Sequence, residues 1–451
     1  MSRRAPARAP VALLAVALAC VAAPAHAKVT LQAVGTVAAG WTDNVLDAPT
    51  QPVAQQSPPV SDFFFQLQPG AALTSAAPRV IQRLGYTFSA DLFVTHSEGN
   101  SYSNTLDWSG FFATSKSSEL LLVLVSQQGR LNTFNLNLPA SAGVATVVTS
   151  TSTSTNFFSQ LFTEGFGWDV DSHWRATQTT ALQIFIPIDR GQLADSYNLV
   201  EELAADRRFR VDSLGALLRC DFVDYEPIRD PVTDVASLRL QQVITSLVGR
   251  WRRDWSPSWS SEAALGVVEA SQVAGPDPKP APTWGPSALA ALRWVRQLST
   301  AELRYAHDIL PNPLASATFI YDAVSLRGSV ALPERSHLFL GATVEYQHAQ
   351  QTAVAAAGTS ADVLLADASI DYRPRPEIGV FARYTLFDQF GAPPSPSGPA
   401  TFPSLRRNTV LVGLSIVYPA LAAARVPNRA GSRVDRSDQP SFPELHSQPR
   451  P

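Results

Sequence analysis

Residues 83–94 alternate between apolar and polar side chains, and this pattern restricts the possible folds of the chain more than any other feature. The apolar and aromatic side chains take every second position, at Leu84, Tyr86, Phe88, Ala90, Leu92 and Val94. The positions between them are small, polar or charged from Arg83 to Asp91, and Phe93 is the exception. A β-strand sends successive side chains to opposite faces, so one face of this segment is apolar and the other is wet. The apolar face must contact either a protein core or lipid.

Similar segments recur along the whole chain, about eighteen in all. They cover residues 29–41, 62–74, 80–95, 105–113, 119–128, 158–170, 174–188, 197–210, 214–222, 237–251, 259–270, 287–295, 301–307, 318–332, 337–347, 362–372, 378–387 and 409–418. The longest purely apolar run after residue 27 is 120–125. That run is far shorter than the about 20 residues that a membrane-spanning helix needs.

The connections between these segments alternate between short and long. The short ones lie near 75–79, 116–117, 172–173, 211–212, 257, 297–298, 333–334 and 374–375. The long ones are rich in Pro, Ser, Thr, Gly or Gln and include 47–61, 132–156, 272–283, 350–359 and 391–404. Outer-membrane β-barrels combine tight periplasmic turns with long outer loops. A soluble sandwich has no physical reason to keep its long loops at one end.

Aromatic residues crowd the segment ends, as they do in the interfacial girdles of membrane barrels. Examples are Trp41, Phe63, Trp168, Trp174, Trp251, Trp259, Trp294, Tyr346, Tyr372 and Tyr418. The sequence therefore predicts an all-β fold, a single closed antiparallel transmembrane β-barrel over residues 28–418 with about eighteen strands. Sixteen strands remain open, because 119–128 is apolar on both faces. Segment 197–210 would place Glu201 and Arg207 on its apolar face, and it fits a short helix or a lumen-facing insertion equally well.

The two ends of the chain differ from the rest. Arginines precede the apolar run 11–21, which ends at the small-residue site Ala25-His26-Ala27, so residues 1–27 read as a secretory signal peptide. The run is too short to span about 30 Å of hydrocarbon. Lipid attachment at Cys20 is the alternative. Residues 419–451 are rich in Pro, Arg and Ser without periodicity, which predicts a disordered periplasmic tail.

Composition excludes some functions and sources of stability. The net charge of −3 gives no electrostatic reason to expect nucleic acid as a partner. Cleavage after residue 27 would leave Cys220 as the only cysteine, so disulfides cannot stabilise the exported chain. A closed barrel, in which each strand pairs with two neighbours, is a stable alternative.

The polar faces of the segments supply candidates for a pore lining. These are Arg83, Asp91, Asp107, Arg219, Asp221, Arg239, Glu262, Arg293, Glu302, Arg304, Glu345, Asp367, Asp371 and Arg383. Because both signs of charge occur, we expect weak ion selectivity. The alternative is that arginines and carboxylates on neighbouring strands pair with one another and only hold the wall rigid.

The first two segments carry a recognisable combination of residues. The stretches Ala38–Leu46 (AAGWTDNVL) and Ser61–Leu73 (SDFFFQLQPGAAL) resemble the start of a family of β-barrel porins associated with exopolysaccharide export. The matching residues are Trp41, Thr42, Asp43, Asn44, Ser61, Asp62, Phe63, Pro69 and Gly70, with Trp where Tyr is commoner. The simpler alternative is that Asp43-Asn44 ends one strand at the outer rim and Ser61-Asp62 starts the next.

The resemblance implies an outer-membrane pore for polysaccharide secretion, with outer-membrane lipid, exported polysaccharide and periplasmic export proteins as partners. A general diffusion porin for small solutes is the alternative. An outer-membrane hydrolase would need an activated nucleophile, and no G-x-S-x-G motif accompanies His96 or the pair His307-Asp308. We therefore expect no catalytic, cofactor-binding or metal site and no enzymatic activity.

Overall fold

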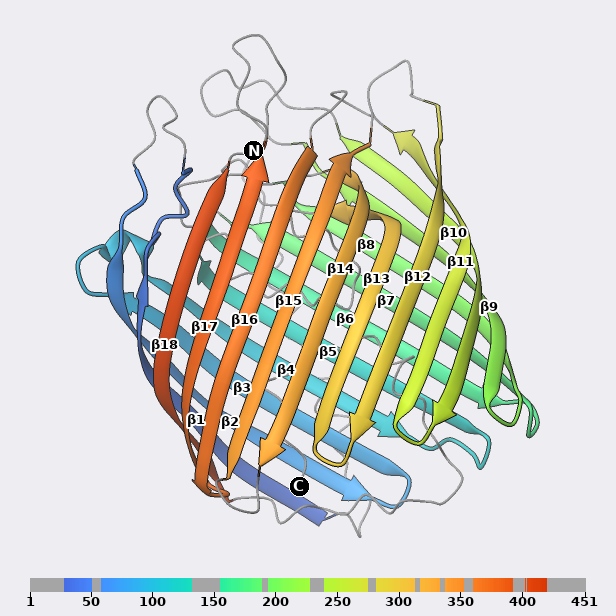
Figure 1. Cartoon of the computed structure of the whole chain (residues 1–451), viewed down its shortest axis with the longest axis horizontal. Coiled ribbons are helices and arrows are strands. Elements are labelled where there is room, and N and C mark those ends of the chain that lie inside the picture. Colours follow the sequence, from blue (N-terminus) through green and yellow to red (C-terminus); the bar gives the residue numbers. More distant parts are fainter. Residues whose placement is uncertain are drawn as a thin grey trace, which may run out of the picture.

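The computed structural model describes residues 28–50, 58–131, 155–188, 194–227, 239–274, 281–312, 317–332, 337–352, 360–391, 402 and 404–419. Within them, 18 antiparallel strands form one sheet in which β1 pairs with both β2 and β18, so the sheet closes into a barrel (Figure 1). The predicted fold class and the count of eighteen are confirmed. The described residues include no helix long and apolar enough to cross a membrane.

The strands follow one another in chain order around the wall. They are β1 (Lys28–Thr42), β2 (Asp62–Ala77), β3 (Val80–Phe93), β4 (Ser101–Phe112), β5 (Ser118–Leu131), β6 (Thr155–Asp169), β7 (Trp174–Pro187), β8 (Ser196–Arg208), β9 (Asp212–Tyr225), β10 (Leu240–Ser256), β11 (Trp259–Ala274), β12 (Thr283–Arg296), β13 (Ser299–Asn312), β14 (Ala317–Leu332), β15 (Leu338–Gln351), β16 (Ser360–Arg375), β17 (Ile378–Gly391) and β18 (Leu405–Tyr418). A short 3-10 helix, Ser97–Gly99, lies between β3 and β4.

Most strands begin or end within a few residues of the positions predicted from alternation. Segment 197–210, which also fitted a helix, is strand β8. The largest differences are at two strand ends: β10, predicted to end at residue 251, continues to Ser256, and β13, predicted to end at residue 307, continues through Pro311 to Asn312. The proposed signal peptide, residues 1–27, and residues 420–451 of the proposed tail lie outside the described residues.

The two faces of each strand differ in exposure and chemistry. On β2, Phe63 and Phe65 are 65% and 56% exposed, whereas Phe64 between them is 6% exposed and packs near Ala38 and Leu411. Residues paired in register across neighbouring strands share a face, so this assignment extends around the barrel. We call the face of Phe63 and Phe65 the outer face and the opposite one the inner face.

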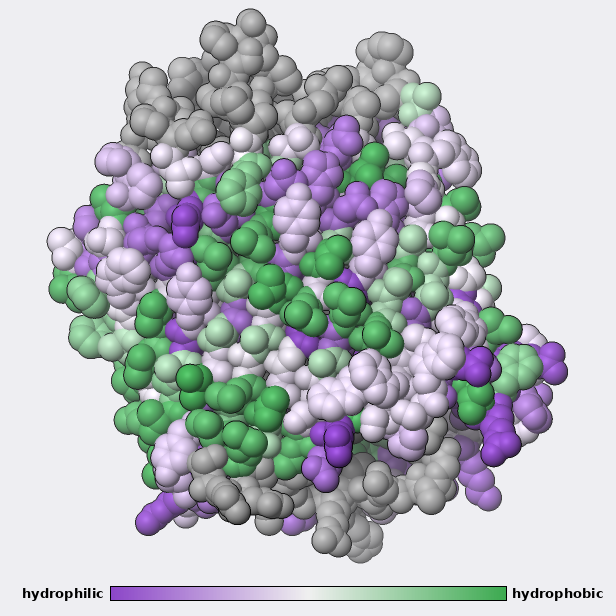
Figure 2. All heavy atoms as spheres, viewed as in Figure 1, coloured by the Kyte–Doolittle hydropathy of each residue, from purple (hydrophilic) through white to green (hydrophobic). Residues whose placement is uncertain are grey.

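Aliphatic side chains dominate the outer face over β14–β18. Exposed residues there include Val324, Leu326, Val344, Val380, Val410, Val412, Leu414 and Ile416. Figure 2 shows hydrophobic residues gathered across the middle of this side, with hydrophilic residues towards the top. A surface of this kind is favourable against lipid hydrocarbon and unfavourable against water.

A belt of tyrosines marks one edge of the apolar surface. In four hairpins a tyrosine hydroxyl on the outer face donates to an Asp or Asn oxygen on the next strand. The pairs are Tyr86 with Asn104 at 2.7 Å, Tyr305 with Asp322 at 3.0 Å, Tyr346 with Asp362 at 2.7 Å and Tyr384 with Asn408 at 2.6 Å. Tyrosine suits the membrane–water interface because its ring is apolar and its tip is polar. The belt lies towards the ends joined by the longer connections, which identifies the outer side of the membrane.

Candidate functional site in the barrel interior

The outer ends of β13 and β14 turn into the barrel instead of following the wall (Figure 1). Pro311 of β13 lines a small cavity together with Gln183 of β7 and Asn198 of β8. The Tyr225 hydroxyl of β9 donates to the Ala317 carbonyl at 3.3 Å. β11 and β12 separate β9 and β10 from this hairpin along the wall. The hairpin end therefore reaches these strands across the inside of the barrel.

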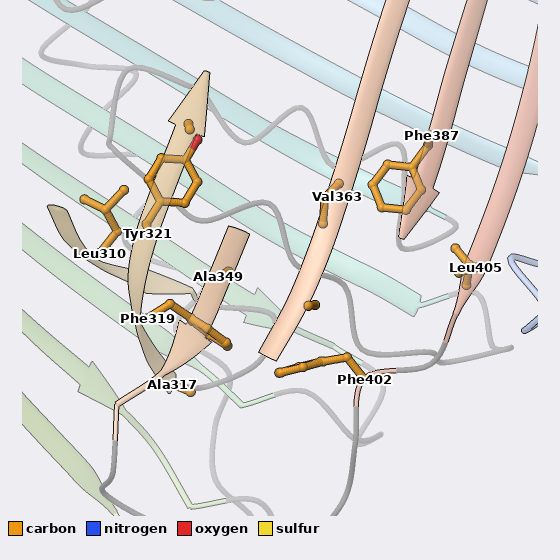
Figure 3. Packing of buried hydrophobic residues seen from close by; sticks show 11 residues of the cluster. Leu310, Ala317, Phe319, Tyr321, Ala349, Val363, Phe387, Phe402 and Leu405 are labelled. Atoms are coloured by element: carbon orange, nitrogen blue, oxygen red, sulfur yellow. The ribbon is translucent and has the colours of Figure 1, made fainter. Parts of the chain in front are cut away.

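An apolar cluster holds the outer end of the β13–β14 hairpin, residues 308–312 and 317–321, from the other side. Phe319 is 0% exposed, and its ring centroid lies 5.6 Å from that of Phe402. Val363 of β16 and Leu405 of β18 belong to the same cluster (Figure 3). Ile309 packs instead with Val223, Ile244 and Val268 of β9–β11. Protein side chains thus cover both faces of the hairpin end, those of β9–β11 on one side and those of β15–β18 on the other. The hairpin end lies between these two parts of the wall and narrows the outer mouth of the barrel.

The local sequence explains why this segment leaves the wall. Apolar residues occupy successive positions at Ile309 and Leu310 and again at 319–321, so the period of two is lost. A strand that is apolar on both faces needs cover on both. Lipid covers only the outer face of a barrel strand, whereas inside the mouth both faces meet protein. The loss of alternation is the signal that could have predicted the inward turn.

Ion pairs brace the inner wall on both sides of the barrel. Arg219 Nε and Nη2 donate to Asp221 at 2.8 and 2.6 Å, a bidentate pair on β9. Arg250 of β10 makes a similar pair with Asp206 of β8, with 2.7 Å from Nε to Oδ1. Arg175 of β7 pairs with Asp169 on the neighbouring strand β6 and with Glu119 on β5, one strand further along the wall. Arg373 pairs with Asp371 on β16 at 3.0 Å.

Three inner-face arginines on neighbouring strands make no such pair. Arg293, Arg304 and Arg327 lie on β12, β13 and β14, and all three are exposed within the barrel. In the described part of the chain, no carboxylate oxygen lies within 4.0 Å of them. Arg293 and Arg327 both stand beside Glu302 in the strand register. These guanidinium groups are available to ions and polar solutes that enter the lumen.

The predicted lining residues divide into two groups. Register places all of them on the inner face except Arg239. Arg239 precedes β10 and donates to Asp224, whose register partner Gln241 points outwards, so its placement in the lumen was wrong. Arg239 shares its parity with Gln241 and Val243, which face outwards, so a consistent alternation along this strand would have placed it outside. Whether the inner-face residues line a conducting path stays a prediction.

Sequence reasoning omitted several inner-face charges. The omitted residues are Glu119, Asp169, Arg175, Glu202, Asp206, Arg250, Arg252, Asp308, Arg327 and Arg373. For most of them the alternation itself was a sufficient signal, because each shares parity with polar neighbours of its strand.

The residues that carried the family resemblance hold the outer seam of the barrel. Asp43 Oδ1 accepts the Asn408 backbone N–H of β18 at 2.7 Å. Asn44 is fully buried, and its amide donates to the carbonyls of Ala48 and Arg406 at 2.8 and 3.0 Å. Asp62 accepts backbone N–H groups from Phe63, Thr95 and His96, each at 2.8 Å. These contacts fit the simpler reading, in which the motif terminates and starts strands.

Asp47 lies buried in the same seam, outside the strands. Burial disfavours its ionised form and raises the pKa of its carboxyl to about 7, although Arg407 at 3.2 Å favours ionisation. Its backbone is left-handed, with φ of 53°. The seam therefore contains a carboxyl group that titrates near neutral pH.

The histidines of the outer rim pair with carboxylates. His307 Nδ1 lies 2.7 Å from Asp322 Oδ1, and His348 Nδ1 lies 2.7 Å from Asp362 Oδ1. Within the described ranges, no serine or cysteine hydrogen-bonds to either imidazole. No group of three or more potential metal ligands occurs in the part of the chain that the structure describes. Among the described residues, the contacts of His307 and His348 do not place a serine or cysteine nucleophile beside an imidazole base.

Comparison with protein-family models finds no match, and comparison with curated proteins finds none either. Solved outer-membrane proteins share the general architecture. OccAB3 from Acinetobacter baumannii aligns with 11% identity and a TM-score of 0.43 over 88% of this chain and 100% of its own. OccK2 (OpdF) from Pseudomonas aeruginosa, solved with glucuronate, gives 12% and 0.41 over 87% and 98%. A bacterial polysaccharide outer membrane secretin gives 10% and 0.34 over 85% and 97%.

The closed sheet, its apolar outer surface with a tyrosine belt and its charged inner wall define the class of the protein. It is an outer-membrane β-barrel.

Proposed function

We propose that the protein is a passive channel for small hydrophilic solutes across the outer membrane. The observation that carries this proposal is the end of the β13–β14 hairpin, which narrows the outer mouth of a barrel with a charged inner wall. Eighteen strands tilted by about 40° enclose a wall of roughly 18 Å backbone radius, wide enough for water before the hairpin end is counted. A narrowed, polar mouth suits solutes of sugar or amino-acid size.

Polysaccharide export, which the resemblance of the first two strands implies, is the competing proposal. A hydrated polymer needs a path that stays wide over its whole length. The inward hairpin end works against such a path, and the motif residues are engaged in backbone contacts at the seam. The diffusion channel is therefore the better-supported function.

Purified protein in planar bilayers and in liposomes tests the proposal. We expect stepwise conductance in KCl and liposome swelling with monosaccharides, and little swelling with oligosaccharides. A deletion strain should take up small solutes more slowly and keep its surface polysaccharide. A barrel that does not conduct, or a deletion that removes surface polysaccharide without slowing solute uptake, would overturn the diffusion channel.

A further inference from the structure

The three unpaired arginines of β12–β14 form a compact arginine cluster on the inner wall. Arg293 of β12 and Arg327 of β14 are both register partners of Glu302 on β13, and Arg304 lies two residues further along β13 on the same face. Diagonal neighbours of this kind lie about 7–8 Å apart, and two strand spacings separate Arg293 from Arg327 by roughly 10 Å. Arginine side chains are long enough to converge across such gaps. The three guanidinium groups can therefore contact one small solute together.

The carboxylate inside the arginine cluster does not neutralise it. Glu302 stands between Arg293 and Arg327 in the register, and among the described residues neither arginine forms an ion pair with it. Elsewhere on the inner wall, Arg219 and Arg250 each hold a carboxylate through two nitrogen atoms. The arginines of the cluster outnumber its one carboxylate, so the cluster has a net positive charge. Their N–H groups remain available to a solute.

Two further carboxylates lie at the level of Arg304, each two strands away from it. They are Glu262 of β11 and Glu345 of β15. Glu262 stands beside Arg252 in the register, and Glu345 accepts the Tyr321 hydroxyl at 3.2 Å. Within the described ranges, neither carboxylate forms an ion pair with Arg304. The positive charge of the cluster is therefore not cancelled from the neighbouring strands.

The residues beside the arginines are small or carry hydroxyl groups. Ala291 and Ser325 are the register partners of Arg304, and Thr343 is the register partner of Arg327. The small side chains leave the guanidinium groups open to the lumen. The hydroxyl groups can donate further hydrogen bonds to an oxygen atom of a solute.

The arginine cluster lies directly below the narrowed mouth. Arg304 and Asp308 share the inner face of β13, four residues apart, and Asp308 begins the hairpin end. At about 3.3 Å per residue and a tilt of about 40°, Arg304 lies roughly 10 Å to the periplasmic side of the hairpin end. A solute that passes the hairpin end on this side of the lumen therefore reaches the arginine cluster.

We infer that the arginine cluster is a binding site for small organic anions that carry carboxylate or phosphate groups. A guanidinium group binds two oxygens of such an anion through parallel N–H donors, and these charge-assisted bonds are stronger than those to a neutral hydroxyl. This assignment rests on the proposed channel function, because a solute reaches the site only through the lumen. It makes organic anions, and not neutral sugars, the solutes that the channel retains.

Calorimetric titration of the detergent-solubilised barrel tests the site without requiring conduction. Succinate and glycerol phosphate are the probes in separate arms, and succinamide is the uncharged probe of similar shape. We expect at least one of the two anions to bind at low ionic strength and succinamide not to bind. The tighter of the two anions identifies whether the site prefers carboxylate or phosphate. Arg304→Gln and Arg327→Gln should each weaken binding by about tenfold, the loss expected for a charge-assisted hydrogen bond.

The matched control is Arg83→Gln, which removes the same charge from the inner face of β3, on the opposite side of the barrel. It should leave the affinity for both anions nearly unchanged. Equal weakening in Arg83→Gln and Arg304→Gln, or the absence of binding by either anion, would overturn the site. A barrel that conducts but binds neither anion would contradict the site alone, and a barrel that binds an anion but does not conduct would contradict the channel alone.

Discussion

Asp47 makes the outer seam sensitive to pH near neutrality. Its carboxyl has a pKa of about 7 in the folded chain and about 3.8 when unfolded. Because the folded pKa is the higher one, the stabilisation is fully present below about pH 4 and is lost as the pH rises through 7. The segment around Asp47 should therefore open more often as the pH rises, by up to about tenfold for each pH unit between about 4 and 7.

Hydrogen exchange at two nearby amides measures this opening. Val45 N–H donates to Val60 O and Thr50 N–H donates to Ser404 O, both at 2.9 Å. Their protection, corrected for the intrinsic pH dependence of exchange, should fall from pH 5 to pH 8 in the wild type and stay nearly constant in Asp47→Asn. Equal protection at both pH values in the wild type would contradict the shifted titration.

The unpaired arginines of β12–β14 should govern the ionic preference of the channel. Replacing Arg293, Arg304 and Arg327 with Gln removes three accessible positive charges and leaves the braced pairs of the wall intact. Each such charge acts on an ion at 4 Å with about 1 kcal/mol in water, so we expect the permeability ratio to shift several-fold towards cations. Reversal potentials in asymmetric KCl measure the shift. Arg406→Gln, on the outer face beside Asp388, is the control and should change little.

The sequence predicted weak ion selectivity from mixed charges on the inner face, and the structure distinguishes the paired charges from the unpaired ones. Arg219, Arg250 and Arg373 are engaged with carboxylates, which was the alternative reading of the mixed charges. Arg293 and Arg304 are not. Alternation shows which face a side chain occupies, but pairing depends on the register between strands, and the sequence does not state that register.

At the scale of strands and hairpins, the end of β13–β14 is the element that distinguishes this barrel from a plain cylinder. Phe319→Ala should release it from Phe402 and the cluster around Leu405, because a Phe→Ala change in a packed site costs about 3–5 kcal/mol. We expect larger and noisier single-channel conductance with little change in the melting temperature of the barrel. Phe390→Ala is the matched control, since Phe390 is 51% exposed on the outer face of β17. Identical conductance in the two variants would show that the hairpin end does not restrict the mouth.

The sequence predicted the number of strands and most of their faces because lipid and water impose the alternation strand by strand. The course of residues 308–312 and 317–320 was missed, since their inward turn is decided by partners on β9–β11 and β15–β18 that lie far away in the sequence. A row of polar outer-face residues, which runs from Glu164 on β6 to Glu269 on β11, was visible in the sequence only as an anomaly at Glu201. Its continuation to Glu164 and Cys220 depends on the register of neighbouring strands.

At the scale of the whole molecule, the two faces should differ in their access to water. Cysteines introduced at Leu340 and Thr343, in a Cys220→Ser background, report on two positions of β15, three residues apart, that point in opposite directions. We expect Leu340→Cys to react with a lipid-soluble reagent and Thr343→Cys with a membrane-impermeant maleimide that enters through the lumen. Labelling of both positions by the same reagent would contradict an open, membrane-embedded barrel.

The seam between β1 and β18 also determines the stage of folding at which the barrel can close. Ten register pairs join the first strand to the last, from Ala33↔Tyr418 to Thr42↔Thr409, and Asn44 adds a bond to Arg406. A nascent chain that lacks its final strand has two unpaired edges, whose backbone N–H and C=O groups lipid cannot satisfy. The barrel can therefore close only after β18 has been synthesised and has paired with β1. A chain truncated before residue 405 should be degraded by periplasmic proteases and leave no inserted product.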